Sequence, residues 1–234
     1  MCANYRPVTR LDRLLTFFGV ERPPGEIPLE FTPEAWPTGL APFIRRAEPG
    51  GRALAAGHFG LLPHFAKEIA YGRRTYNARS ETVHELVSFK RAWARGQRCI
   101  VPTEAIYEPC WETGKAVRWC IQQPGDVPLG IAGIWTEHPW LTAADGAPLL
   151  SFAMLTVSGA GHPVFQRMHR PTDEKRMVMI IDPAEYDRWL QCPVAEAATF
   201  FRPWPGPLDA FPAPLAPRRR GEGPGGGGAE AGLF

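Results

Sequence analysis

The chain of 234 residues has no apolar run that approaches the roughly 18 residues needed to cross a membrane as a helix. The most apolar stretch near its start, LLTFFGV at 14–20, is too short for such a span and has no small-residue cleavage site behind it. We therefore expect neither a membrane anchor nor a secretory signal. The sequence predicts a cytoplasmic monomer.

Cysteine is scarce and irregularly spaced. The sequence has five cysteines, an odd number, and none belongs to a CxxC pair, so we expect reduced thiols rather than disulfides. These residues are Cys2, Cys99, Cys110, Cys120 and Cys192. Neither the cysteines nor the six histidines fall at zinc-ligand spacings, so we expect no structural metal, and we predict no cofactor.

A large net charge is also missing, but the charge of +2 is unevenly distributed. Residues 1–100 hold 15 Lys and Arg against 9 Asp and Glu, whereas residues 101–234 hold 11 against 15. The positive excess concentrates at 65–98, where aromatic residues are interleaved. Cations beside aromatic rings suit single-stranded nucleic acid, because the charges pair with phosphates and the rings stack on bases.

Within that segment, Arg73, Arg74 and Arg79 are the main candidates for phosphate contacts, and Phe65 is a candidate to stack on a base. The alternative is a solvated helix face. For 81–95 this alternative is preferred, because ETVHELVSFKRAWAR has the spacing of an amphipathic helix that buries apolar residues. These residues are Val83, Leu86, Val87 and Trp93.

The first sixty residues predict little regular structure. A helix is expected over 7–20, with Thr9 as its cap, and 21–50 is interpreted as a Pro-rich loop with strands too short to assign. A buried strand is expected within 52–63, ending at Pro63.

The remainder predicts strands separated by Pro, Gly and Asp. The expected strands lie within 98–109, 116–123, 129–135, 149–157 and 175–182, and a short helix capped by Asp182 lies at 183–191. Strands dominate and long helices are few, which predicts a single α+β domain with a largely antiparallel, barrel-like twisted sheet flanked by short helices. This domain is expected to span 1–204, and the Pro/Gly-rich segment 205–234 is expected to be a disordered tail.

Cys2 stands directly behind Met1. Removal of Met1, which is usual when residue 2 is small, would leave an α-amine with a pKa of about 7.7–8.0 next to a thiol with a pKa of about 8.5. The amine can condense with an aldehyde to an imine, and the thiolate can close on the imine carbon to give a thiazolidine. The alternative is a small buried residue with no chemical role, which is common for cysteine.

Seven motifs follow one another in a specific order and spacing. They are MCANY at 1–5, FGLLPHF at 59–65, YNARSET at 76–82, RCIVPTEAIYEPCW at 98–111, LGIAGIW at 129–135, SFAMLTV at 151–157 and MHRPTDEKRMVMII at 168–181. With them the chain resembles the SRAP family (SOS-response-associated peptidases, or abasic-site processing proteins) from Cys2 to about Trp204. In that family the N-terminal cysteine crosslinks abasic sites in single-stranded DNA through a thiazolidine.

The resemblance implies roles for single residues. It assigns the nucleophile to Cys2, the acid that opens the sugar ring to Glu108, a hydrogen-bonding role to Asn77 and proton transfer to His169. It also assigns a phosphate contact to Arg79. Among other residues of this sequence, Glu104 is the rival of Glu108, and His162 is the rival of His169.

Three departures from the family pattern leave parts of the resemblance open. Asn4 stands where relatives often have Arg, which removes one DNA contact near the nucleophile. The letters PCW follow YE where W is commoner, so the loop around Glu108 is uncertain. Phe59 and Phe65 stand in place of tryptophans, and Phe59 is expected in the core.

The resemblance implies a DNA-damage response protein that binds abasic sites in single-stranded DNA and forms a covalent crosslink through Cys2. It also implies a lyase side activity, trimming of its own N-terminus as a peptidase, and association with the nucleoid when bound to DNA. Two alternatives remain. One is a cysteine amidohydrolase with an N-terminal nucleophile, and the other is a non-catalytic module that binds single-stranded nucleic acid.

Overall fold

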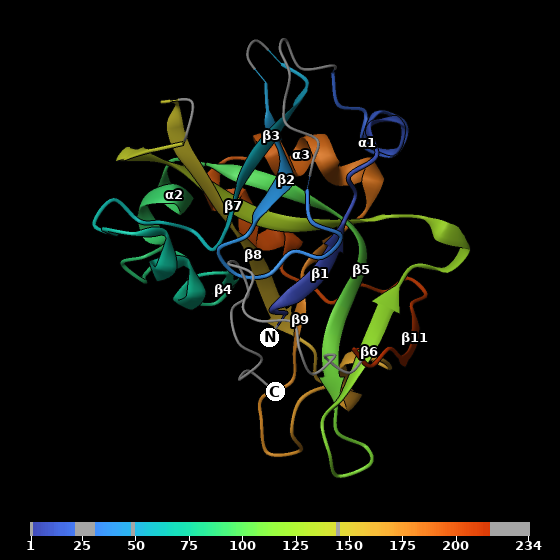
Figure 1. The fold of residues 1–234 in the computed structure, drawn as a ribbon. Coiled ribbons are helices and arrows are strands. Elements are labelled where there is room, and N and C mark those ends of the chain that lie inside the picture. Colours follow the sequence, from blue (N-terminus) through green and yellow to red (C-terminus); the bar gives the residue numbers. More distant parts are fainter. Residues whose placement is uncertain (1, 22–30, 48–49, 144–145, 216–234) are drawn as a thin grey trace, which may run out of the picture.

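Five strands close into a barrel in the computed structural model, which describes residues 2–21, 31–47, 50–143 and 146–215 (Figure 1). The barrel strands are β2 (Leu40–Arg46), β3 (Arg52–Phe59), β5 (Arg98–Cys110), β7 (Leu129–Thr142) and β8 (Pro148–Ser158). Their order is β5-β7-β8-β3-β2, and β2 pairs with β5 to close the ring. All of these pairs are antiparallel except β3 with β8. The predicted α+β fold with a largely antiparallel, barrel-like sheet is confirmed.

The barrel encloses the main hydrophobic core. The rings of Phe43 and Phe59 pack on Phe152 with centroids 5.4 and 5.6 Å away, and all three side chains are fully buried. Phe59 therefore lies in the core, as expected. Most of β8 is buried, so its sequence LLSFAMLTV is a continuous apolar run rather than an alternating one.

The long strand β5 connects the barrel to the region around the chain start. Its first half pairs with β2 and β7, and its second half pairs with β1 (Asn4–Pro7) and β6 (Val117–Gln122). In Figure 1, β5 begins beside α2 and ends beside β6. The register places Asn4 opposite Tyr107, so residues at the start of the chain lie next to the end of β5.

Short strands and helices complete the fold. The strands are β4 (Asn77–Arg79) and β9 (Arg176–Val178), both paired with β8, β10 (Ile180–Ile181), paired with β7, and β11 (Asp209–Pro212), paired with β6. The α-helices are α1 (Leu11–Phe18), α2 (Lys90–Ala94) and α3 (Tyr186–Gln191). The 3₁₀ helices are η1 (Ile69–Arg74), η2 (Pro124–Asp126), η3 (Phe165–Arg167), η4 (Pro183–Glu185) and η5 (Val194–Phe200).

The first fifty residues differ from the prediction in two ways. The helix expected over 7–20 begins only at Leu11, after Arg10 as N-cap, and no side-chain hydrogen bond caps it, so the assignment of Thr9 as the cap is wrong. The strand β2 lies inside the expected loop. Its Pro42 cannot donate a ladder hydrogen bond, but β2 pairs with β5 only at Ile44 and Arg45, so no partner on that side needs this donor.

The helix predicted over 81–95 is wrong for most of its length. Only α2 is α-helical, and successive turns precede it, with Leu86 N–H donating to Thr82 and Lys90 N–H donating to Leu86. Leu86 and Val87 are 48% and 55% exposed, so they do not form the expected buried face. β-Branched residues such as Thr82 and Val87 have low helix propensity, which favours separate turns over a continuous helix.

The segments near the C-terminus differ less from the predicted elements. The strand expected at 175–182 is divided at Met179, whose N–H donates to β8 at Leu155 and whose carbonyl accepts from β7 at Ala132. Asp182 caps the following turn as predicted, since its side chain accepts from Ala184 N–H at 2.9 Å. The predicted disorder after 204 is wrong for β11, which is held by its pairing with β6; residues 216–234 lie outside the described residues.

Candidate functional site

The four residues predicted to be catalytic come from four separate segments, and the structure brings them together. Cys2 precedes β1, Asn77 begins β4, Glu108 lies near the end of β5, and His169 lies in the loop between η3 and β9. The pairing of β1 with the end of β5 brings Cys2 to Glu108. Direct contacts then join Asn77 to Cys2 and His169 to Glu108.

Cys2 is held as a buried, protonated thiol. Its side chain is 1% exposed, and Sγ donates to the carbonyl of Asn4 at 3.4 Å. Burial raises the pKa of the Cys2 thiol well above its ordinary value, and the negative charge of Glu108 raises it further. A reaction at this sulfur therefore needs a nearby group that accepts the thiol proton.

Asn77 contacts the backbone of Cys2 through one half of its side-chain amide. Nδ2 donates to the carbonyl oxygen of Cys2 at 2.8 Å. The other amide atom, Oδ1, is buried and has no hydrogen-bond partner among the described residues. An amide offers both donors and an acceptor, so Asn77 has an acceptor available for an N–H or O–H group beside Cys2.

Glu108 and His169 form a buried acid–base pair. Their residues are 1% and 8% exposed, and His169 Nε2 lies 3.5 Å from Glu108 Oε2. Burial lowers the pKa of His169, and the charge of Glu108 opposes that shift. The imidazole is therefore mainly neutral near pH 7 and can accept a proton.

The loop that carries His169 is fixed at several points. The backbone N–H of His169 donates to the carbonyl of Pro109 at 2.7 Å, and His169 adopts a left-handed φ of 62°. Lys175 Nζ donates to three successive carbonyls of this loop, at 2.9 Å to Met168, 3.2 Å to His169 and 2.7 Å to Arg170. Lys175 thus holds the backbone of the loop at His169 and at the residue on either side of it.

The PCW departure after Glu108 contributes to the same anchorage. Cys110 forms an isolated antiparallel bridge with Met168, and the guanidinium of Arg170 lies 5.1 Å from the ring centroid of Trp111. β5 continues without a register shift through Pro109 to Cys110, opposite β6. The departure therefore does not interrupt the strand at Glu108.

Both rival residues are occupied by structural contacts. Glu104 accepts two hydrogen bonds from Arg13 of α1, at 2.8 and 2.7 Å. His162 Nδ1 accepts from the N–H groups of Val164 and Phe165, and Nε2 lies 3.2 Å from the carbonyl of Trp204. Burial lowers the pKa of His162, as expected for a neutral ring that holds a turn.

The predicted DNA-contact residues lie on the surface. Arg73 and Arg74 end η1 and are exposed. Phe65 is 37% exposed, and its ring meets that of Tyr71 edge-on with centroids 5.6 Å apart. The Phe65 side chain is therefore partly accessible to solvent.

Arg79 has an intramolecular partner that the sequence does not predict. Its Nη2 lies 2.8 Å from Glu174 Oε2, and both side chains are about half exposed. Arg176 contacts the same carboxylate at 3.0 Å and also pairs with Glu81. An arginine predicted to bind phosphate is thus linked to the loop that ends with Lys175.

Two further residues belong to this region. Burial raises the pKa of the Tyr76 phenol, and the charges of Cys2 and Glu108 act in the same direction. The position of Tyr76 directly before Asn77 is a signal that sequence reasoning could have used. Asn4 is fully buried, and its Oδ1 accepts from Arg118 Nη2 at 2.7 Å, so an arginine from β6 reaches this position.

The described residues also bear on the expectations for disulfides, metal sites and membrane spans. All five cysteines are free and buried. No group of three or more His, Cys, Asp or Glu side chains within the described residues is arranged to hold a metal ion. Among the described helices, none has the length and apolar character to span a membrane.

Known proteins with similar sequences carry abasic-site names. Abasic site processing protein YoaM of Bacillus subtilis is 30% identical over 101 residues, which cover 42% of each chain. Abasic site processing protein HMCES of Pongo abelii is 27% identical over 142 residues, covering 49% of this chain and 40% of that protein. The chain thus matches less than half the length of these relatives.

Solved structures and a family description extend the match. A Bordetella bronchiseptica protein is 36% identical with a TM-score of 0.79, covering 92% of this chain and 100% of that one. A Bacteroides thetaiotaomicron protein at 21% identity, with a TM-score of 0.75 over 90% of this chain and 91% of that one, shares the fold. The family of SOS response associated peptidases (SRAP) matches residues 1–213. The chain therefore belongs to the SRAP family.

Proposed function

We propose that this protein acts in the DNA-damage response by binding abasic sites in single-stranded DNA and capturing their aldehyde covalently through Cys2. The observation that carries the proposal is the contact of Asn77 with the Cys2 backbone beside the buried Glu108–His169 pair. Membership of the SRAP family and the names of the similar proteins support the same substrate.

The reaction begins with opening of the sugar. An abasic deoxyribose is mostly a closed hemiacetal, so its aldehyde becomes available only when the ring oxygen is protonated and the C1–O bond breaks. In our proposal Glu108 acts in its protonated form and donates this proton as a general acid, and the neutral imidazole of His169 accepts the proton of the C1 hydroxyl. The two side chains are close enough to exchange protons, with Nε2 and Oε2 3.5 Å apart.

Capture then proceeds in two balanced steps. Removal of Met1 leaves the α-amine of Cys2, which adds to the C1 aldehyde and loses one water to form an imine. The Cys2 sulfur next adds to the imine carbon, and its proton moves to the imine nitrogen, which closes the thiazolidine. We propose that Asn77 Oδ1, which is buried without a hydrogen-bond partner among the described residues, accepts a hydrogen bond from the amine and holds it toward the aldehyde.

The raised thiol pKa favours this order of events. A buried, protonated sulfur is a weak nucleophile, so the amine reacts first and the thiol follows once its proton can be passed on. The imine also acidifies the neighbouring C2 hydrogens. β-Elimination with strand scission is therefore a proposed side activity, and removal of residues ahead of Cys2 is the proposed peptidase activity.

DNA would approach over the exposed cations near the site. Arg73 and Arg74 are exposed, and Phe65 is partly exposed. Arg79 would exchange Glu174 for a phosphate. An exposed ion pair of this kind contributes at most about 1 kcal/mol, so the exchange costs little.

The test compares abasic and unmodified single strands with amide substrates, using wild type, Cys2→Ala and Cys2→Ser. We expect a heat-stable adduct only with the abasic strand and wild type, and at most a labile adduct with Cys2→Ser. Hydrolysis of amides without adduct formation would favour a cysteine amidohydrolase. Unchanged DNA binding without an adduct in every variant would favour a non-catalytic binding module.

A further inference from the structure

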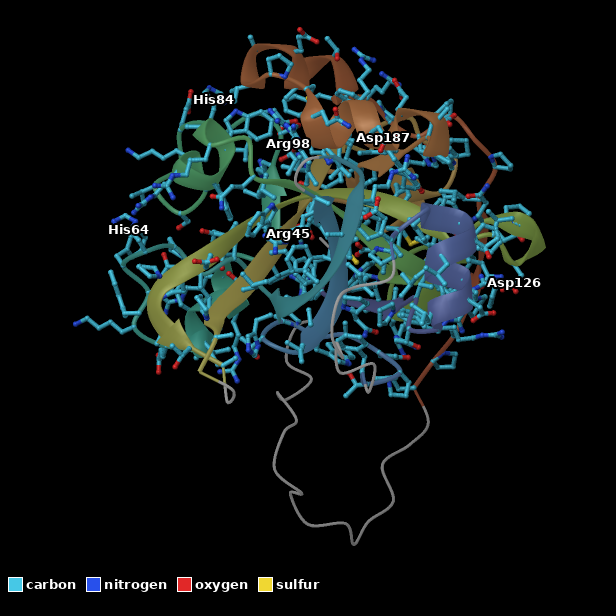
Figure 2. All side chains as sticks on the ribbon, turned by 90° about the horizontal axis from the view of Figure 1, so that it is seen from above. Arg45, His64, His84, Arg98, Asp126 and Asp187 are labelled. Atoms are coloured by element: carbon cyan, nitrogen blue, oxygen red, sulfur yellow. The ribbon has the colours of Figure 1, made fainter. Side chains whose placement is uncertain are left out.

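A second cluster of positive charge lies at the opposite end of β5 from Glu108. A pocket of 460 Å³ between β2, the end of α2 and the end of α3 is lined by Arg45, Arg46, Arg95 and Arg98, and no acidic residue lines it. In Figure 2, Arg98 lies between the ribbon near His84 and the ribbon near Asp187, with Arg45 beside it. Ten residues of extended strand separate Arg98 from Glu108, which is up to about 33 Å.

Three of these arginines lack a carboxylate partner among the residues that the structure describes. Arg45, Arg95 and Arg98 form no ion pair with any carboxylate in the described part of the chain. The guanidinium of Arg45 lies over Trp135 at 4.8 Å, and its Nε is buried without a hydrogen-bond partner among the described residues. Arg95 is exposed. Neighbouring like charges without counter-charges are unfavourable unless an anion offsets them.

Arg98 is the unusual member of the cluster. It is 3% exposed, and its guanidinium lies 5.3 Å from the ring centroid of Trp93 and 5.4 Å from that of Trp189. Its Nη1 donates to the carbonyl of Cys192 at 2.7 Å. A buried charge is usually paired, but within the described ranges Arg98 is compensated by a carbonyl and two rings alone. Arg98 therefore adds positive potential beneath the pocket, while Arg45 and Arg95 can reach a ligand.

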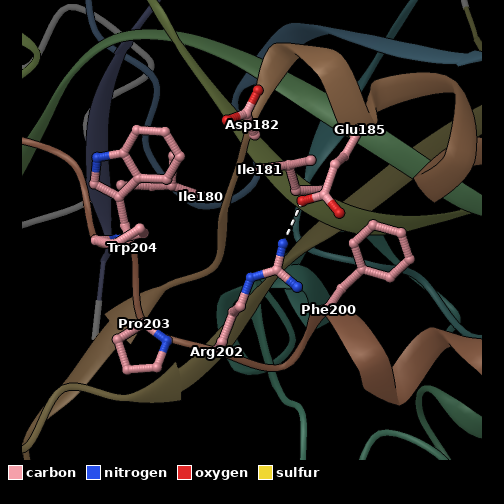
Figure 3. Close-up of a pocket in the computed structure, with 9 residues that line it drawn as sticks. Ile180, Ile181, Asp182, Glu185, Phe200, Arg202, Pro203 and Trp204 are labelled. Atoms are coloured by element: carbon pink, nitrogen blue, oxygen red, sulfur yellow. Dashed lines mark hydrogen bonds and ion pairs between the residues drawn. The ribbon is translucent and has the colours of Figure 1, made fainter.

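A smaller hollow elsewhere in the protein also contains an arginine, but there the positive charge is neutralised. The hollow of 70 Å³ in Figure 3 contains Arg202, whose guanidinium is paired with Glu185 (Figure 3). The lining therefore carries its own counter-charge. The arginine pocket differs because its lining supplies none.

The arginine pocket continues into a neighbouring hollow. This hollow of 280 Å³ shares Arg95, Gln97 and Trp135 with the pocket and adds Arg91 and one acidic residue, Glu137. Two adjacent hollows that share lining residues, with arginines along both, suit an extended series of phosphates better than a single one.

We propose that this arginine pocket is a phosphate-binding site, separate from the Cys2 site, in which Arg45 and Arg95 contact phosphate oxygens and Arg98 strengthens the potential. The shared chemistry is the phosphate group, supplied by a nucleic-acid strand or by a small phosphorylated molecule. The inference does not depend on the abasic-site proposal, because binding here needs no aldehyde and no Cys2.

The test uses the full chain with two probes, an unmodified 20-nucleotide oligothymidylate and inorganic pyrophosphate. The pocket variant is Arg45→Gln with Arg95→Gln. The control, Arg10→Gln with Arg188→Gln, removes the same charge from exposed arginines paired with Asp12 and Glu185. Arg95→Gln alone serves if the double variant has a lowered thermal midpoint.

If a strand occupies the pocket, the pocket variant should lower the slope of log K against log salt by about 1.4 more than the control, since each single-strand contact contributes about 0.7. If a small molecule occupies it, pyrophosphate should bind wild type with a stoichiometry of one and bind the pocket variant at least tenfold more weakly. Either of these two results would support the phosphate-binding site. Equal behaviour of the pocket and control variants toward both probes would overturn it, whatever the outcome at Cys2.

Discussion

Asn77 donates a 2.8 Å hydrogen bond to the backbone carbonyl of Cys2, a residue 75 positions earlier in the chain. The contact depends on two strand pairings, of β4 with β8 and of β1 with β5. It fixes the backbone next to the amine and thiol that the proposed reaction needs.

Asn77→Ala should slow adduct formation by roughly 2- to 13-fold, because a hydrogen bond of this kind contributes roughly 0.5–1.5 kcal/mol to holding its partner. Affinity for unmodified single strands should stay within about twofold, since no phosphate contact is lost. Quench-flow kinetics with an abasic oligonucleotide measure the rate, and fluorescence anisotropy measures the affinity. A normal rate in Asn77→Ala would show that the contact is only structural.

Glu108→Gln should slow adduct formation by roughly 10²–10⁴-fold if Glu108 is the general acid. Preformed adduct should also reverse more slowly, because reopening the thiazolidine needs the same proton. Glu104→Gln is the control, since Glu104 lies on the same strand, β5, but is held by Arg13 of α1 outside the cluster around Cys2. Loss of activity in Glu104→Gln with normal activity in Glu108→Gln would reverse the assignment.

Lys175 is predicted to position His169. Lys175→Met removes three donors from the His169 loop and a positive charge that lowers the pKa of His169. The pKa of His169 should rise in this variant, so the acidic limb of the pH–rate profile should move to higher pH. The maximal rate should also fall, and Lys175→Arg should restore part of both effects. An unmoved acidic limb would argue against this role.

Arg79 and Glu174 should have opposite effects on DNA binding. Arg79→Ala should weaken binding to single strands and lower the salt slope by about 0.7. Glu174→Gln should tighten binding, because it releases Arg79 from its carboxylate partner. Anisotropy titrations at several salt concentrations measure both, and equal affinities in the two variants would return Arg79 to a structural role.

Much of the barrel could be predicted because its strands are long β-branched and aromatic runs. The strand β2 could not be predicted, because its sequence LAPFIRR contains Pro42, which has no N–H to donate to a neighbouring strand. This proline is tolerated because β2 pairs with β5 only at Ile44 and Arg45. The helix expected at 81–95 failed because the apolar spacing is compatible with a set of turns. Leu86 and Val87 are exposed in these turns, and the periodicity of the sequence cannot distinguish such exposed apolar residues from the buried face of a helix.

For the site, the motifs predicted which residues meet, and the structure adds how they are held. Cys2, Asn77, Glu108 and His169 converge although 167 positions separate the first from the last. The pairing of Arg79 with Glu174 and the threefold contact of Lys175 depend on the path of one loop. No local pattern in the sequence encodes that path.

The most direct test of the central claim is the intact mass of the purified protein before and after incubation with an abasic single-stranded oligonucleotide. The account predicts a protein that begins at Cys2 and an adduct whose mass equals that of protein plus oligonucleotide minus one water. It also predicts no adduct for Cys2→Ala. Active protein that keeps Met1, or the same stable adduct in Cys2→Ala, would contradict the thiazolidine mechanism.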